Sequence, residues 1–261
     1  MRSNDLEKPA GVLMRQSGPG NGDAIREKVS RVRERIARAA ARAGRNAGDI
    51  RLLPVTKTVP AERMRAAFDA GLAAFGENKV QEARTKAEAL ADLAIEWSII
   101  GHLQTNKARY VARFAAEVQS LDSVKVAEAL DRRLDKESRE LDVFVQVNTS
   151  GEASKYGLPP DEVQAFLRKL PAFTALRVRG LMTLAVFSDD AARVRACFRR
   201  LRALRERLQQ DAPAGIRLDE LSMGMSGDFE LAIEEGATVV RVGQAIFGPR
   251  PLPDSHYWPG T

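Results

Sequence analysis

A lysine stands at the end of an apolar run in the segment LLPVTKTVP, residues 52–60. Residues 52–56 have the composition of a buried strand, and Lys57 follows them directly. Lysine is a nucleophile only when uncharged, and burial or a nearby cation lowers its pKa enough to populate that form. An uncharged amine here could condense with an aldehyde. Taken alone, the pattern also fits a lysine that extends its ammonium group into solvent.

A second segment, SMGMSGD (residues 222–228), combines serines and glycines just before a helical pattern. Glycines such as Gly224 let backbone N–H groups approach a ligand closely, and the first turn of a helix presents unpaired N–H groups. Ser222 and Ser226 add hydroxyl donors. The segment predicts an anion-binding loop, provided that the Asp228 carboxylate points away from the anion. A tight strand-to-helix turn capped by Ser226 is the alternative.

Arg241 and Gly243 end the last apolar run, VVRVG. An arginine there could supply the charge that a phosphate dianion needs, and phosphate sites in barrels often follow strands seven and eight. An amine and a phosphate site at one opening, without a dinucleotide fingerprint, point to pyridoxal 5′-phosphate, which carries both an aldehyde and a phosphate. We expect this cofactor to attach covalently, as a Schiff base, to Lys57.

The order of the predicted elements indicates how these segments come together. Helical patterns alternate with short apolar runs, which favours a parallel sheet of right-handed βαβ units. Eight such units fit a single-domain (β/α)₈ TIM barrel over residues 23–248 better than an open doubly wound sheet. Strands are expected at residues 51–56, 72–75, 96–100, 117–121, 142–148, 177–183, 218–222 and 238–242. Helices are expected at residues 25–43, 60–70, 79–91, 104–114, 123–139, 160–169, 189–209 and 227–235.

The two ends of the chain differ from this pattern. Residues 1–22 are polar and rich in glycine and proline, which predicts a disordered leader without a signal peptide or membrane span. Residues 249–261 form a short tail.

Composition restricts the classes of function. The net charge is +6 and is spread over mixed-sign helices, which does not suggest a nucleic-acid-binding protein. The arginine-rich helix at 193–207 places its apolar residues at core spacing, so we expect its arginines to face solvent. The single cysteine excludes an internal disulfide and fits a reducing cytoplasm, and the spacing of Cys and His matches no zinc site.

Seven ordered motifs resemble one family. They are PVTKTVP, FGENKVQEA, IGHLQTNK, VNTSGEASKYG, GLMT, LSMGMSGDFELAIEEGAT and VRVGQAIFG. Together they resemble the pyridoxal-phosphate homeostasis proteins, also called the YggS or PROSC family, over residues 25–248. That family is similar to the barrel domain of the fold-type III alanine racemases.

The resemblance implies roles for individual residues. Lys57 matches the cofactor-bearing lysine. The phosphate-binding positions of the family fall on Ser222, Ser226, Arg241 and Gly243, and on the backbone of the 223–226 loop, which includes Met223 and Gly224. Independently of the resemblance, Asn78, in FGENK, is expected either to reach the ring oxygen of the cofactor or to bond the turn beside it. Two departures from the family pattern, at Lys79 and in the LAVFSDD segment, concern only the shape of the site's mouth.

A racemase of this type needs a base on each face of the cofactor. Lys57 could serve one face. Tyr156 is the one tyrosine at the correct end of the barrel, and we expect it to pack at the rim; no second domain is expected to supply another. We therefore predict a monomeric carrier that holds, buffers and passes on pyridoxal phosphate without turnover, with transient contacts to dependent apoenzymes and none to membranes. An amino-acid racemase is the alternative.

Overall fold

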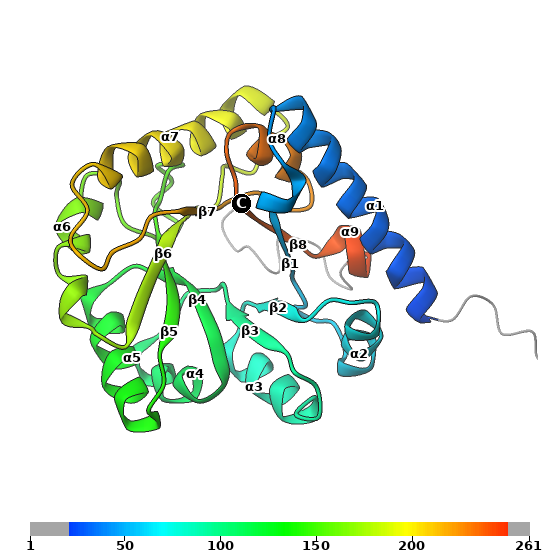
Figure 1. The fold of residues 1–261 in the computed structure, drawn as a ribbon, viewed down its shortest axis with the longest axis horizontal. Helices are drawn as coiled ribbons and strands as arrows, with labels where there is room; N and C mark the ends of the chain where they lie inside the picture. The colour runs from blue at the N-terminus through cyan, green and yellow to red at the C-terminus, as the bar shows by residue number, and fades with distance from the viewer. Residues whose placement is uncertain (1–20, 250–261) are drawn as a thin grey trace, which may run out of the picture.

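The computed structural model describes residues 21–249, which form a ring of parallel strands surrounded by helices (Figure 1). Neighbouring strands follow the order β1-β8-β7-β6-β5-β4-β3-β2. The strands are β1 (Arg51–Pro54), β2 (Ala74–Glu77), β3 (Glu96–Ile99), β4 (Ala115–Leu121), β5 (Leu141–Gln146), β6 (Leu176–Met182), β7 (Glu220–Ser222) and β8 (Val239–Val242). This nearly closed eight-stranded arrangement confirms the predicted (β/α)₈ barrel.

Helices α2 to α8 lie between successive strands, α1 precedes β1 and α9 follows β8. They are α1 (Asn21–Arg42), α2 (Ala61–Asp69), α3 (Val80–Ala89), α4 (Ala108–Phe114), α5 (Val124–Glu137), α6 (Val163–Leu167), α7 (Ala191–Gln209), α8 (Phe229–Glu234) and α9 (Gln244–Phe247). Residues 21 and 22, predicted to belong to the leader, are the first residues of α1. The rest of the predicted leader, and the predicted tail beyond Pro249, lie outside the described residues.

The contact between β1 and β2 closes the ring over a short length. Arg51 and Val55 donate their N–H groups to Thr238, just before β8, and to Val242 of β8. Because successive residues of a strand face opposite neighbours, positions 52 and 54 face β2. Pro54 has no N–H group and can donate nothing on that side. The barrel is closed just beyond the carboxyl end of β1. There Val55 and Gly76 form an isolated parallel bridge, and the Thr56 N–H donates to the Gly76 carbonyl at 3.0 Å.

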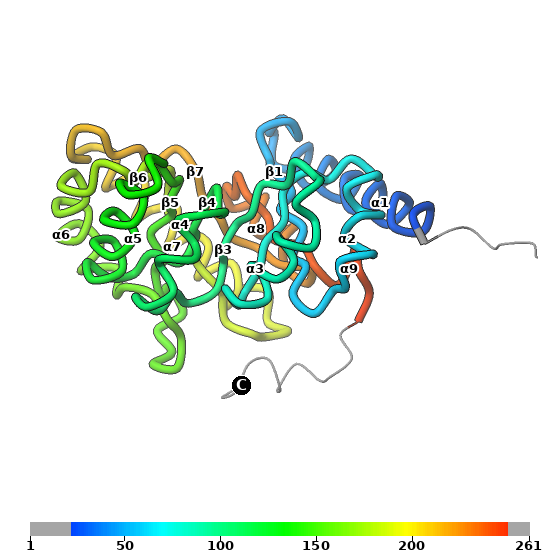
Figure 2. Tube along the Cα trace, turned by 90° about the horizontal axis from the view of Figure 1, so that it is seen from below, coloured from blue at the N-terminus to red at the C-terminus, as the bar shows by residue number. Residues whose placement is uncertain are grey.

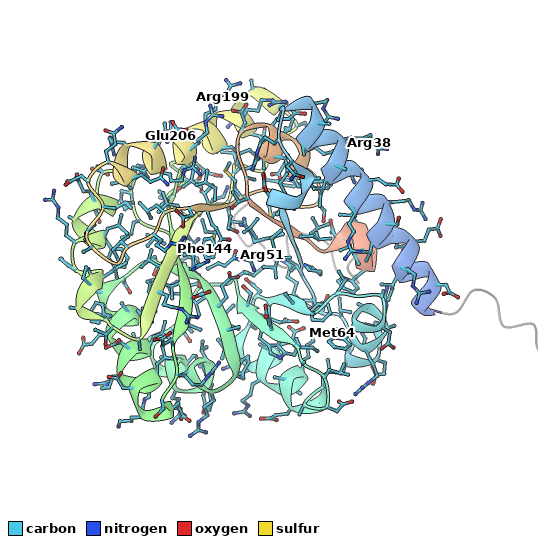
Figure 3. All side chains as sticks on the ribbon, in the orientation of Figure 1. Arg38, Arg51, Met64, Phe144, Arg199 and Glu206 are labelled. Atoms are coloured by element: carbon cyan, nitrogen blue, oxygen red, sulfur yellow. The ribbon has the colours of Figure 1, made fainter. Side chains whose placement is uncertain are left out.

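Two apolar layers hold the barrel. The inner layer is a small cluster of Leu53, Phe144, Met182 and Val239. Figure 3 shows Phe144 and Arg51 within the ring of strands, whereas Arg199 and Glu206 lie on the outer helix α7. The outer layer packs the other faces of the strands against the helices. Strand residues therefore alternate between a narrow interior and a larger outer core.

The predicted apolar face of the first helix is confirmed. Ile25, Val29, Val32 and Ile36 are all buried, and α1 lies across α8 and α9 in Figure 1. Arg35 adds an ion pair with Glu230 of α8 at 2.9 Å. Helix α1 thereby covers the part of the barrel where β8 meets β1.

Helix α7 buries the apolar residues that the sequence predicted, including Phe198 and Leu201. Some of its arginines also form ion pairs with a neighbouring helix. Arg195 and Arg199 form ion pairs with Glu235, which follows α8 directly. The predicted solvated face is confirmed for Arg199, whose side chain is 61% exposed, whereas the Arg195 side chain is only 27% exposed because the end of a neighbouring helix covers it and supplies a carboxylate.

Several elements differ from the prediction. Helix α4 begins at Ala108, four residues later than predicted, after the 3₁₀ turn Thr105–Lys107. Strand β2 lies two residues later than expected and includes Gly76 and Glu77, because a buried partner compensates the carboxylate. Helix α6 is shorter than predicted and a separate 3₁₀ turn, Leu170–Ala172, follows it. Helix α9 was not predicted, since it has a single turn after the last strand.

The loops after β5 and β6 extend below the barrel in Figure 2, on the side where the strands end. Within residues 21–249 no helix has the length and apolar character needed to cross a membrane.

Candidate functional site

Lys57 lies in the turn that follows β1, half-buried at the carboxyl end of the barrel. Its side chain lines a small pocket together with Gly243 and residues of α9, Gln244 and Phe247. The pocket thus joins the ends of β1 and β8, which are neighbours in the sheet. Two residues singled out from distant parts of the sequence, Lys57 and Gly243, share one opening.

Gly243 allows the backbone of β8 to pass close to β1. A Cβ atom added at this position would lie 3.0 Å from the Val55 carbonyl oxygen, tighter than ordinary contact. Any larger residue would also fill the pocket that Lys57 lines. The glycine therefore keeps this side of the opening free.

Gly224 shapes the loop between β7 and α8. Its φ of +96° is in the left-handed region, and an added Cβ would lie 2.6 Å from the Ala232 Cβ. The preceding residue, Met223, is fully buried in the outer core and its N–H donates to the Val239 carbonyl. The Met223 amide is therefore already bonded within the sheet, and the predicted role of Met223 in binding the ligand remains a prediction.

The next residues of this loop present unpaired donors. Within the described residues, the N–H groups of Gly224 and Ser226 have no hydrogen-bond acceptor. The Ser226 hydroxyl accepts the Gly243 N–H at 3.2 Å, which joins the loop to the end of β8. Ser226 thus links the loop to a residue that lines the pocket.

The anion-site prediction required the Asp228 carboxylate to point away from this loop. In the structure the carboxylate points toward the loop instead. Its Oδ1 accepts the Met225 N–H at 2.5 Å and so occupies one of the predicted anion-binding amides. Burial raises the pKa of Asp228 above its usual value, whereas the Met225 hydrogen bond and Arg241 act in the opposite direction. A carboxylate therefore competes with any anion at this amide.

Arg241 is the buried cation of the site and is only 3% exposed. Its guanidinium donates to the Ser222 hydroxyl at 2.6 Å and to the Thr183 carbonyl at 2.7 Å, and both acceptors are uncharged. No carboxylate of residues 21–249 lies within ion-pair distance of it. Burial lowers the pKa of Arg241 to about 10, so the group stays charged at neutral pH.

Ser222 connects Arg241 to a chain of buried polar side chains inside the barrel. The Ser222 hydroxyl donates to Gln119 Oε1 at 2.6 Å, and Gln119 donates to Glu117 at 2.7 Å. Glu117 in turn pairs with Arg51 at 2.6 Å, near the opposite end of the barrel. Gln119 was missed in the sequence because a polar residue within a strand does not reveal its partners; its alternation with Glu117 was the available signal.

Asn78 follows β2 and packs directly on Gly101. A Cβ atom at Gly101 would lie 2.2 Å from the Asn78 carbonyl oxygen and 2.3 Å from its Oδ1. Gly101 thus makes room for the Asn78 backbone and side chain. This contact lies between two neighbouring loops and leaves both predicted roles of Asn78 open.

Tyr156 lies at the rim and is 59% exposed. Its ring stacks on His102, with the ring centroids 4.0 Å apart. His102 Nδ1 lies 3.5 Å from Asp122, whose pKa is raised by burial and lowered by the histidine. The stacking agrees with the prediction that Tyr156 packs at the rim.

Potential metal ligands do not converge in the described part of the chain: no group of three or more His, Cys, Asp or Glu side chains is placed to hold an ion. The pocket lined by Lys57 is joined to the serine–glycine loop through the hydrogen bond from Gly243 to Ser226, and the buried guanidinium of Arg241 belongs to the same strand end, two residues before Gly243. This set of groups is suited to a small organic anion.

Comparison with known proteins defines the class first. Residues 24–251 match the family model of the alanine racemase N-terminal domain. An alanine racemase from Streptomyces lavendulae has the same fold, with a TM-score of 0.69 at 18% identity; the match covers 89% of this chain and 59% of that one.

The more similar relatives define the family. The chain is 43% identical over 224 residues to a pyridoxal phosphate homeostasis protein from Aquifex aeolicus, covering 86% of this chain and 97% of that protein. It is 44% identical over 226 residues to the protein of the same name from Pseudomonas aeruginosa, covering 87% and 96% respectively. The chain belongs to the family of pyridoxal phosphate homeostasis proteins, which confirms the resemblance drawn from the seven motifs.

A solved structure of this family contains the cofactor. PipY of Synechococcus elongatus with pyridoxal phosphate bound has a TM-score of 0.76 and 37% identity to this chain; the match covers 86% of this chain and 100% of PipY.

Proposed function

We propose that this protein binds pyridoxal 5′-phosphate at the opening between β1 and β8 and acts as a carrier in the homeostasis of this cofactor. Family membership and the cofactor-bound relative support the ligand. Localisation in the cytoplasm, a monomeric state and brief contacts with dependent apoenzymes are further parts of this proposal.

One observation carries the proposal: Arg241 is buried, charged and surrounded by neutral acceptors. A buried charge is costly unless an opposite charge compensates it. A phosphate dianion near Ser222 and Ser226 would supply that opposite charge. Because no carboxylate is bonded directly to the guanidinium, such a ligand would be its first direct anionic partner, in addition to the longer-range effect of Asp228 and Glu117.

The residues around the opening also suit the chemistry of the cofactor's two reactive ends. Gly224 and Ser226 present unpaired N–H groups in a loop that is bonded to Gly243, and Lys57 lines the pocket that includes Gly243. When bound, pyridoxal phosphate supplies an aldehyde that condenses with an uncharged amine with loss of water. Lys57 is the amine that we assign to this role.

The protein's own groups would then divide the work of holding the ligand. Arg241 and the 224–226 loop would neutralise and orient the phosphate, while Gly243 keeps the passage to Lys57 open. Asn78 lies at the end of β2, next to β1, where its side chain could contact the ring oxygen or continue to support the loop at Gly101.

We favour a carrier over a racemase because the structure offers a poor second base. Tyr156 is largely exposed and stacked on His102, so its hydroxyl is not held in a desolvated position. In addition, the match covers nearly all of each homeostasis protein but only 59% of the racemase chain. The racemase likeness, at 18% identity, concerns the fold.

The test begins with the absorption spectrum of purified protein titrated with pyridoxal phosphate. Borohydride reduction followed by peptide mass spectrometry should place the cofactor on Lys57. Lys57→Ala should lose the reducible adduct, whereas Lys155→Ala, which changes a lysine of the rim, should keep it. Cofactor fixed on another lysine, or no visible band in the wild-type protein, would contradict the proposal.

A separate assay distinguishes carrier from enzyme. Cofactor-loaded protein should leave the chirality of free amino acids unchanged, and should restore activity to a pyridoxal-phosphate-dependent apoenzyme. Loss of chirality that depends on Lys57 would establish the racemase alternative instead.

A further inference from the structure

A second lysine, Lys86, lies close to the turn that carries Lys57. It belongs to α3 and is only 7% exposed. Its ammonium group donates to the Thr56 carbonyl at 2.7 Å, to Glu77 Oε1 at 2.7 Å and to Glu82 Oε1 at 2.6 Å. All three N–H donors of this lysine are therefore used within the protein.

The partners of Lys86 also hold the residues on either side of Lys57. Before it, the Thr56 hydroxyl donates to Glu77 Oε1 at 2.6 Å. After it, the Thr58 N–H donates to Glu82 Oε1 at 2.6 Å. Both flanking residues are thus fixed by one group of charges, which we call the Lys86 cluster: Glu77, Glu82 and Lys86.

The turn needs this support because Thr58 has a φ of +65°. A β-branched residue rarely adopts the left-handed region, and such conformations persist only where surrounding contacts impose them. The hydrogen bond from the Thr58 N–H to Glu82 is such a contact. Residue 57 is therefore placed by a strained turn that the cluster holds in shape.

Stability alone explains the cluster poorly. Buried ion pairs are often no more stabilising than apolar residues of the same volume. Glu77 is fully buried, its Oε2 has no hydrogen-bond partner among the described residues, and burial raises its pKa despite the opposing effect of Lys86. A costly arrangement is thus located where it contacts the backbone next to Lys57.

We propose that Glu77, Lys86 and Glu82 are positioning residues, which fix the turn at residues 56–58 so that the Lys57 amine is directed into the pocket it shares with Gly243. The inference rests on the proposed function for the identity of the ligand. The geometry of the turn, however, can be tested without it.

The decisive variants change Glu82, whose Oε1 accepts the Thr58 N–H. Glu82→Gln keeps an oxygen that can accept this bond, whereas Glu82→Met has similar length and no acceptor. Glu88→Met is the matched control, because Glu88 lies on the same helix and only pairs with Arg84 on the surface, at 3.4 Å.

The first measurement uses cofactor-free protein. The rate at which Lys57 is acetylated by acetic anhydride is followed by peptide mass spectrometry and normalised to a surface lysine, Lys125. We expect Glu82→Met to change the normalised rate at least about threefold, and Glu82→Gln and Glu88→Met to stay within about 1.5-fold of wild type.

The second measurement uses the visible circular dichroism of bound pyridoxal phosphate, which reports the orientation of the ring. Glu82→Met should reduce the band and release the cofactor about tenfold faster. Rescue by Glu82→Gln would separate positioning from a general loss of structure. Should Glu82→Met fail to fold, Glu82→Asp, which withdraws the carboxylate by one methylene, takes its place with the same expectations.

Equal acetylation rates in wild type and Glu82→Met, or equal effects of Glu82→Met and Glu82→Gln, would overturn the inference even if the cofactor binds. Failure of the wild-type protein to bind pyridoxal phosphate would instead refute the proposed function, and the acetylation rates would still decide whether the cluster positions Lys57.

Discussion

Two buried cations lie near the candidate site, and their surroundings differ. Lys86, near the β1 end, contacts two carboxylates and a carbonyl, so its charge is compensated within the protein. Arg241, on β8, donates to a hydroxyl and a carbonyl, so no carboxylate pairs with it directly, and its charge is favoured only at longer range by Asp228 and Glu117. The difference shows how one site can contain a cation that supports the fold and another that is available to a ligand.

The largest expected effect follows from removing the compensated cation. Lys86→Met leaves Glu77 buried without its partner and should lower the free energy of unfolding by about 3 to 5 kcal/mol, measured by urea denaturation. Lys86 is the main group that opposes the burial effect on Glu77, so the pKa of Glu77 should rise further in this variant. A carboxyl group with a raised folded-state pKa favours folding at acidic pH and loses that contribution as pH rises, so the deficit should shrink on acidification.

Two controls accompany this variant. Arg84→Met removes an exposed cation of the same helix and should change the unfolding free energy by less than about 0.5 kcal/mol. Adding Glu77→Gln to Lys86→Met should recover part of the loss. If Lys86→Met is as stable as wild type, Lys86 does not compensate the buried charge of Glu77. The contrast drawn between Lys86 and Arg241 is then wrong.

The second largest effect concerns the uncompensated cation. Arg241→Met should weaken pyridoxal phosphate binding about 100-fold, because charge-assisted hydrogen bonds are lost. The unfolding free energy of the free protein should fall by less than about 1 kcal/mol, since the lost hydrogen bonds are offset by removal of a desolvated charge. Equilibrium titration and urea denaturation measure the two quantities.

Arg51 provides the control for Arg241, because it ends the same polar chain and already pairs with Glu117. Arg51→Met should lower stability and leave cofactor affinity within about twofold. A comparable loss of affinity in both variants would mean that the net charge of the barrel, rather than the position of Arg241, governs binding.

A smaller effect on stability is expected in the loop between β7 and α8, near Arg241. Close packing rather than charge determines the conformation of this loop. Gly224→Ala introduces a side chain at φ +96° and 2.6 Å from Ala232 Cβ, and should cost about 2 kcal/mol of unfolding free energy. Gly151→Ala, at φ +76° with open space around it, should cost about 1 kcal/mol. Thermal or urea unfolding measures the difference in unfolding free energy between the two variants. Equal values would mean that the loop rearranges to accept the added methyl group.

The smallest effect is expected at Asp228, the carboxylate that competes for the Met225 amide. Asp228→Asn should strengthen pyridoxal phosphate binding a few-fold at neutral pH, because a negative charge beside the phosphate is removed. The pKa of Asp228 is raised by burial, so the wild-type affinity should approach that of the variant as falling pH protonates the carboxyl group. Weaker binding by Asp228→Asn at every pH would show instead that the carboxylate is needed to shape the loop.

The sequence predicted the parts of this molecule that depend on local pattern. Strand and helix periodicity gave all eight strands and the buried face of α1 because each repeats over several residues. Lys57, Gly243 and Gly224 could be selected because their residue types are unusual at the ends of apolar strands. The family resemblance added the assignment of these positions to one ligand.

The polar partners could not be predicted in the same way. Lys86 and Gln119 contact residues far away in the sequence, and neither residue type reveals whether its partner will be charged or neutral. The position of Lys86 on the apolar face of α3, beside Val80 and Ala83, was the only local signal. The error in the bounds of β2 has a similar origin, since Glu77 of β2 is buried beside a lysine of the following helix, nine residues later.

Pro54 gives the β1–β2 contact a lasting asymmetry. Because this residue cannot donate a hydrogen bond toward β2, the two strands cannot form a full ladder. The isolated bridge between Val55 and Gly76 is the contact that joins β1 to β2 and closes the barrel. The chain segment immediately beyond that contact is residues 56–58. Loosening of this contact would therefore move Lys57, the amine proposed to bind the cofactor, more than the residues of the longer β4–β5 and β5–β6 ladders on the opposite wall.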